Sequence, residues 1–60
     1  MYTVDILPGR HFSAIDDALN AGMAEHTRFN VVDSNDVIVR RVSLTGRFGR
    51  QFFDIINVED

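Results

Sequence analysis

Apolar and polar residues alternate at the start of the chain, where Thr3 and Asp5 separate Tyr2, Val4 and Ile6. Successive side chains of a strand point to opposite faces of a sheet, so this pattern predicts a short strand with one apolar face. A Pro-Gly pair follows at 8–9, and both residue types favour turns. We therefore expect the first strand to end at this turn.

Between residues 12 and 26 the apolar spacing changes to three and four residues, which is the period of a helix. The stripe consists of Phe12, Ile15, Ala18, Leu19, Gly22, Met23 and His26. Ser13 is a candidate N-cap residue, because its hydroxyl can accept a hydrogen bond from the first turn. Asp16 and Asp17 follow in that turn, where the helix dipole favours negative charge. The pattern predicts one helix over residues 14–26.

Two runs of mainly β-branched residues, 28–32 and 37–44, flank the polar sequence Asp-Ser-Asn-Asp at 33–36. Asp and Asn favour tight turns, since they bond their own backbone and tolerate positive φ. The segment therefore predicts a β-hairpin with its turn at 33–36. Arg40 and Arg41 lie inside the second run, so that they point to opposite faces. An edge strand protected by charge is the simplest interpretation of this pair.

The stretch TGRFGRQFF at 45–53 holds two glycines, two arginines and three phenylalanines. Phe48, Phe52, Ile55 and Ile56 would suit a helix beyond it. The glycines and the aromatic and β-branched composition favour a strand instead. We predict that the stretch is a turn leading into a core strand over 51–58, with its arginines left outside.

These elements give the order β-α-β-β-β, so the predicted fold class is α+β, with one helix packed on a small, mostly antiparallel sheet. Sixty residues suffice for one domain, and we expect a single compact domain over 1–60. The chain has no cysteine, which excludes disulfides, thiol catalysis and cysteine-type zinc fingers. A domain this small buries only about 60% of its unfolded surface, so a partner or a self-dimer would add stability.

The chain has no basic start followed by an apolar run, and no apolar run approaches the ~20 residues of a membrane span. The sequence therefore predicts a complete cytoplasmic protein without a membrane partner. In a phage-encoded protein this would be the cytoplasm of the host cell.

The net charge of −3 is unevenly distributed along the chain. Residues 1–36 carry six acids and two arginines, whereas residues 37–60 carry four arginines and three acids. All six basic residues are arginine. This division predicts an acidic and a basic part of the surface. Overall acidity disfavours non-specific nucleic-acid binding as the main activity.

The sequence offers no catalytic constellation. His11 and His26 flank the predicted helix, and at ~1.5 Å per residue they lie too far apart to share a metal or an active site. Asp16 and Asp17 are adjacent on a helix and point in different directions, which disfavours an acid–base pair. The two glycines of the 45–53 stretch lack the spacing of a phosphate-binding loop. We therefore predict a protein that is not an enzyme and has no cofactor or metal.

Protein recognition is the remaining class. If the carboxylates of the helix and of the 33–36 turn share a face, they can complement a basic groove on another protein. The candidate contact residues are Asp16, Asp17, Asp33, Asp36, Arg47, Phe48 and Arg50. This small, acidic, cysteine-free profile resembles the accessory proteins of phages and mobile elements, including anti-CRISPR inhibitors. We expect an inhibitor or adaptor that occludes a nucleic-acid-binding host protein.

Two alternatives from other classes stay open. The first is a nucleic-acid-binding module that uses its C-terminal basic and aromatic side chains. The residues concerned are Arg40, Arg41, Arg47, Arg50 and Phe48. The second is a small structural homodimer whose apolar sheet face pairs with itself. The sequence leaves open the partner and the order of the strands.

Overall fold

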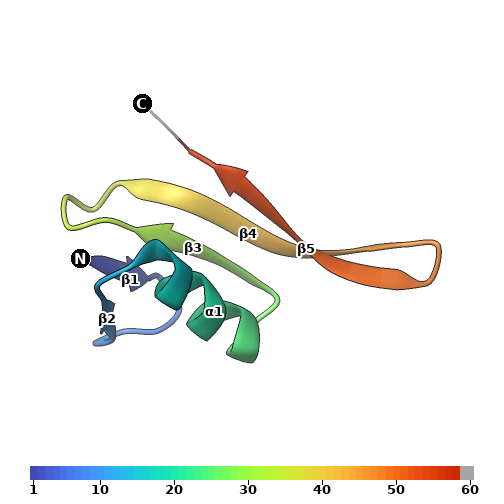
Figure 1. The fold of residues 1–60 in the computed structure, drawn as a ribbon, viewed down its shortest axis with the longest axis horizontal. Helices are drawn as coiled ribbons and strands as arrows, with labels where there is room; N and C mark the ends of the chain where they lie inside the picture. The colour runs from blue at the N-terminus through green and yellow to red at the C-terminus, as the bar shows by residue number, and fades with distance from the viewer. Residues whose placement is uncertain (59–60) are drawn as a thin grey trace.

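The computed structural model describes residues 1–58, which form five strands and one helix (Figure 1). The elements in chain order are β1 (Tyr2–Val4), β2 (His11–Phe12), α1 (Ile15–Glu25), β3 (Arg28–Val32), β4 (Ile38–Arg47) and β5 (Arg50–Asn57). The strands form one sheet in the order β2-β1-β3-β4-β5, and every neighbouring pair is antiparallel. The predicted α+β class, with one helix on an antiparallel sheet, is confirmed.

The sequence pattern missed β2, which is only two residues long. It pairs with β1 through Tyr2 opposite Phe12 and Thr3 opposite His11. Phe12, which the sequence pattern counted in the apolar stripe of the helix, therefore belongs to a strand. The short strand protects one edge of the sheet, because two residues offer little backbone for another chain to pair with.

Helix α1 begins one residue later and ends one residue earlier than the 14–26 expected from the spacing. The prediction that Ser13 caps it is wrong. Ala14 occupies the N-cap position with an extended backbone (φ −128°), and no side chain caps the helix there. Asp16 and Asp17 do lie in the first turn, where the helix dipole favours their negative charge.

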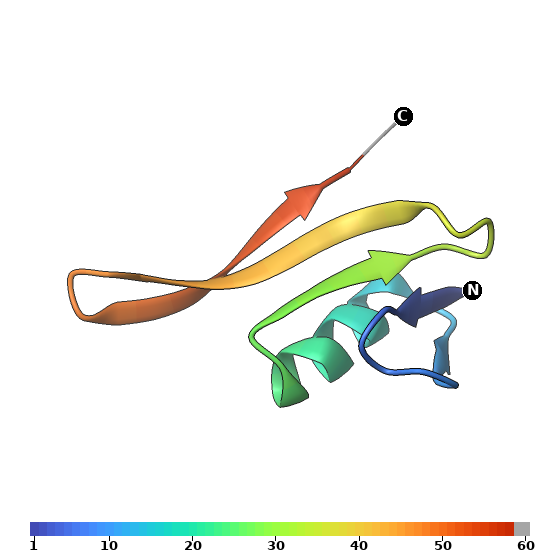
Figure 2. The same ribbon diagram turned by 180° about the vertical axis from the view of Figure 1, so that it is seen from behind.

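The core lies between α1 and the strands that it covers, β1 and β3 (Figure 2). Its buried residues are Val4, Leu7, Ala18, Leu19, Phe29, Val31 and Val42. Gly22 allows the closest approach of helix and sheet, because the ring of Phe29 packs directly over it. A Cβ atom at Gly22 would lie 2.5 Å from Cζ of that ring.

The predicted turn at 33–36 connects β3 and β4, as its Asp and Asn residues indicated. The backbone N–H groups of Asn35 and Val37 donate to Oδ1 of Asp33, at 2.8 and 3.1 Å. Asp36 has a φ of 63°, a conformation that Asp tolerates better than most residues. The side chain of Asp33 therefore holds this turn together.

The C-terminal strand is also confirmed, since β4 and β5 form a hairpin closed by Phe48 and Gly49. Two other expectations about this hairpin are wrong. β5 is an edge strand rather than a core strand, and Phe53 is its only residue that is even half-buried. The Arg40–Arg41 pair lies on β4, which β3 and β5 flank, so it does not protect an edge. The 11-residue helix packs on β1, β2 and β3, whereas β4 and β5 contribute only Val42, Val39 and Phe53 to the core and its surroundings.

Candidate functional site

The structure divides the predicted contact residues between the two ends of a molecule that is 38 Å long. The turn at 33–36 lies at the end where the chain starts, and α1 begins from this side (Figure 1). The turn at 48–49 lies at the opposite end, where the β4–β5 hairpin projects beyond the helix (Figure 1). Acidic and basic candidates therefore do not form a single site.

At the acidic end, Asp33 and Asp36 border a shallow hollow of about 330 Å³ that His11 and Thr3 also line. The sequence did not connect His11 with this turn, because β2 brings it there through pairing with β1. In residues 1–58, no group of three or more His, Asp or Glu side chains is placed to hold a metal ion. Asp33 is half-buried and uses Oδ1 for the turn, so its carboxylate is partly engaged.

Arg10 is fixed by contacts within the protein. Its Nη1 donates to Oε2 of Glu25 at 3.2 Å, which is the one salt bridge found within the described part of the chain. Its guanidinium also lies 5.4 Å from the ring centroid of Phe12. These contacts connect the loop before β2 to the end of α1. Asp16 and Asp17 are exposed and are left as the free carboxylates of the helix.

At the opposite end, Phe48 forms the tip of the hairpin and is fully exposed, with a relative exposure of 102%. Its φ of 52° lies in the left-handed region, which non-glycine residues rarely adopt. Gly49 follows with a φ of 78°. Two successive positive φ angles in a two-residue loop are the signature of a type I′ turn, which favours Asn-Gly. Phenylalanine is therefore an unfavourable choice for the turn.

Arg47 and Arg50 face each other directly across the hairpin, immediately before and after the tip. Residues that face each other in an antiparallel pair project from the same side of the sheet. Both arginines are exposed, and the like charges oppose close approach of the strands. The tip thus presents one phenyl ring beside two guanidinium groups.

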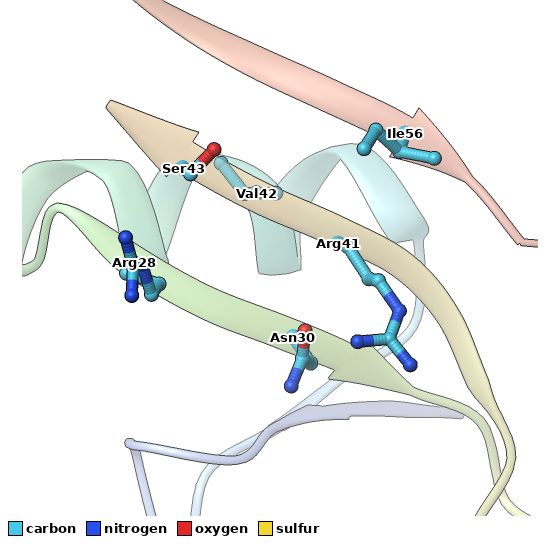
Figure 3. A pocket seen from close by; sticks show the side chains of 6 residues that line it. All are labelled: Arg28, Asn30, Arg41, Val42, Ser43 and Ile56. Atoms are coloured by element: carbon cyan, nitrogen blue, oxygen red, sulfur yellow. The ribbon is translucent and has the colours of Figure 1, made fainter. Parts of the chain in front are cut away.

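The sheet face away from α1 carries a second group of polar side chains. Arg28, Asn30, Arg41, Val42, Ser43 and Ile56 line a hollow of about 250 Å³ there (Figure 3). Asn30, Arg41 and Ile56 form one row across β3, β4 and β5. Figure 3 shows Arg41 extending from β4 toward Asn30. The sequence did not single out Arg28 or Asn30, because only the strand register brings them beside Arg41.

Asn30 is held in this row by Asp5. Its backbone N–H donates to Oδ1 of Asp5 at 2.9 Å, and its Nδ2 donates to Oδ2 at 3.1 Å. Asp54 faces Ser43 on the same sheet face. Carboxylates therefore accompany the two arginines of this face, which is mixed in charge rather than purely basic.

Arg40 lies on the other face, since it pairs with the buried Val31. It is half-buried, and its Nη1 donates to the carbonyl oxygen of Val39 at 2.7 Å. The arginines proposed as a nucleic-acid contact set therefore do not share one surface. Arg41 belongs to the open face with Arg47 and Arg50, whereas Arg40 does not.

Large apolar side chains follow β5 away from the tip. Phe52, Ile55 and Ile56 are 47%, 41% and 51% exposed. The register places Phe52 and Ile56 on the open face, opposite Thr45 and Arg41. Exposed aromatic and aliphatic groups among arginines are typical of surfaces that bind proteins.

Comparison of the chain with protein-family models, curated proteins and solved structures finds no match in any of the three. Within residues 1–58, no helix has the length and apolar character needed to cross a membrane. The function is therefore inferred from the chain's own side chains.

Proposed function

We propose that this protein is a non-enzymatic module that binds another protein through the tip of its β4–β5 hairpin. Phe48 is the observation that carries the proposal. A phenyl ring at this position contributes nothing to the core, because it is fully exposed. It also places a bulky residue where the turn favours Asn. Residues that are unfavourable for folding and exposed at a projecting tip are typical of binding sites.

The flanking arginines indicate the chemistry of the partner. Arg47 and Arg50 lie on one side of the tip and repel each other in the free protein. A carboxylate between two guanidinium groups would remove this repulsion and form charge-assisted hydrogen bonds. The partner surface that fits best is an apolar pocket for Phe48 with acidic residues at its rim.

The more specific proposal is an inhibitor, similar in role to anti-CRISPR proteins, that occludes the nucleic-acid groove of a host protein. It relies on the opposite end of the molecule, where Asp16, Asp17 and Asp36 are exposed and Asp33 is half-buried. Charge reversal of the exposed acids should weaken binding to such a partner and reduce its salt dependence. Unchanged affinity in an Asp16→Lys/Asp17→Lys/Asp36→Lys variant would exclude this contact set.

A nucleic-acid-binding module is the second candidate, favoured by four arginines on the open face and at the tip. These are Arg28, Arg41, Arg47 and Arg50. Asp54 and Asp5 are their neighbours and reduce the attraction for phosphates. This candidate predicts oligonucleotide affinity that falls steeply with salt. Absence of binding in low salt would remove it.

Affinity capture with matched variants tests the proposed protein binding. Tagged wild-type protein, Phe48→Asn and Asn20→Ala are incubated with lysate of the source cell, with and without nuclease. We expect a nuclease-resistant protein that the wild type and Asn20→Ala retain equally, since Asn20 is an exposed helix residue. Phe48→Asn should lose it. Equal retention by Phe48→Asn contradicts binding through the tip, and loss on nuclease treatment supports the nucleic-acid candidate.

A further inference from the structure

β5 leaves one side of its backbone open, since it is the last strand of the sheet formed by residues 1–58 (Figure 2). Natural edge strands are usually short, bulged, or interrupted by lysine or proline. β5 has eight residues with neither proline nor lysine, and its register with β4 runs without a shift. Arg50 is the first residue of β5, and Asp54 is its only other charged residue. Such an edge is a template for pairing with another strand.

The free backbone groups of β5 belong to its odd-numbered residues. The N–H of Val58 donates to the carbonyl oxygen of Val39 at 3.0 Å, so that residue 58 faces β4. Backbone groups alternate between the two sides of an antiparallel strand. Gln51, Phe53 and Ile55 therefore direct their N–H and C=O groups outward, where an added strand would bond them.

The side chains of β5 fit a second copy of the same strand. A two-fold axis perpendicular to the sheet pairs the strands antiparallel and keeps equivalent faces on the same side. The axis then passes midway between the two copies of one residue, on which the pairing is centred. Centred on Phe52, this pairing places Arg50 opposite the second copy's Asp54 and the two Phe52 rings opposite each other. Centred on Asp54, it opposes two carboxylates. Centred on Phe53, it places Phe52 opposite a carboxylate.

The pairing centred on Phe52 also offsets the repulsion between Arg47 and Arg50 of the free protein. Arg50 faces Arg47 across the hairpin, and a carboxylate from the second copy on its other side would offset this repulsion. Residues 50–54 lie toward the projecting tip, away from α1 (Figure 1). The two helices would therefore stay apart.

We propose that the outer edge of β5 binds a second copy of this chain, in an antiparallel pairing centred on Phe52. The two five-stranded sheets then join into one continuous sheet. This inference rests on the edge and charges of β5, and it does not depend on the partner that the tip binds.

Disulfide trapping tests the register directly, because the chain has no cysteine of its own. Two residues at 52 would form a non-hydrogen-bonded pair with Cα atoms ~4.5 Å apart, which a disulfide can bridge. Phe52→Cys should give a covalent dimer on mild oxidation. Ile56→Cys, on the same strand and face, should stay monomeric. Absence of a covalent Phe52→Cys dimer, or equal trapping at both positions, overturns the proposed register.

Charge exchange supplies an independent test by sedimentation over a range of concentrations. Arg50→Asp and Asp54→Arg each oppose like charges and should weaken dimerisation about tenfold. The double variant exchanges the partners and should restore it. A wild-type chain that sediments as a monomer at every concentration overturns the proposal, as does a double variant no better than the single ones.

Gln51→Pro separates this inference from the proposed function. It removes an outward N–H that the second copy would bond, and edge strands tolerate proline at such positions. We expect a folded monomer that still retains the lysate protein through Phe48. A dimer that persists in Gln51→Pro contradicts pairing through β5. Loss of capture by Phe48→Asn without loss of the dimer shows that the two surfaces act separately.

Discussion

The molecule has two regions, which we call the body (residues 2–42) and the arm (residues 43–57). Their strands belong to one sheet, but the two regions differ in how many of their side chains are buried. Every buried residue of the described chain lies in the body, and none of residues 43–57 is buried. The main contacts of the helix are with β1, β2 and β3, which belong to the body. The buried core therefore lies in the body, and Phe53 of the arm packs against it. Phe48, Phe52, Ile55 and Ile56 of the arm are left exposed and available for contacts with other molecules.

Residue type alone does not explain which side chains are buried. Phe29 in the body and Phe52 in the arm both lie on β-strands, with relative exposures of 2% and 47%. What differs is the position of the strand relative to α1. The exposed strand β5 is held by backbone bonds to β4, by the turn that closes the hairpin, and by Phe53, which packs against the core.

The largest expected effect comes from removing the ring of Phe29. A buried Phe→Ala substitution costs about 3–5 kcal/mol, and a chain of this size has roughly 3–9 kcal/mol of stability in total. Phe29→Ala should therefore be largely unfolded at 25 °C by circular dichroism and urea titration. Phe52→Ala, the matched substitution in the arm, should lose less than about 1 kcal/mol. Equal losses would contradict the division into body and arm.

The second effect concerns the contact between helix and sheet at Gly22. Alanine favours a helix over glycine by about 1 kcal/mol, but its Cβ would overlap the Phe29 ring. Overpacking of this kind costs about 1–3 kcal/mol, so we expect Gly22→Ala to lower the melting temperature. The smaller side chain of Phe29→Leu should make the same glycine substitution less harmful. A gain in stability from Gly22→Ala alone would show that the ring moves aside freely.

A smaller effect is expected at the turn between β3 and β4, where Asp33 accepts two backbone hydrogen bonds. Asp33→Ala should lower the free energy of unfolding by about 1–2 kcal/mol. Asp33→Asn keeps an oxygen acceptor and should retain most of the stability. Ser34→Ala is the neighbouring control in the same exposed turn and should change little. Equal stability of Asp33→Ala and Ser34→Ala would mean that these bonds are replaced by water without loss.

Local signals were enough to predict every element of both regions except β2. The spacing from Ile15 to Met23 placed the helix, and the Asp and Asn residues at 33–36 placed the first hairpin turn. The β-branched tail was also correctly predicted as a strand. Each of these features depends on residues close together in the sequence.

Long-range pairing was not accessible in the same way. The strand order decides that β5 is an edge, and the register decides that Arg28, Asn30 and Arg41 meet. The two-residue β2 has no pattern of its own and exists because β1 pairs with it. Phe48 is exposed because the register of β4 and β5 places it in the turn of the hairpin. The number of phenylalanines in the sequence does not show which of them lies in the turn.

Phe48→Asn has the smallest expected effect on stability. It is also the most specific test, because we expect the variant to gain stability and to lose binding. Phe48→Asn gives the arm the Asn-Gly sequence that a type I′ turn favours, and it removes an exposed apolar ring. We expect a gain of about 0.5–1 kcal/mol, measured as a rise of a few degrees in melting temperature. Capture of the partner protein should fall in the same variant.

Phe48→Leu is the comparison, since it keeps an apolar tip without relieving the strain of the backbone, and it should retain part of the binding. A variant that gains stability and loses binding identifies Phe48 as a residue kept for its contacts. Loss of stability in Phe48→Asn would instead mean that the ring supports the arm itself, and the body and the arm would then both depend on aromatic packing.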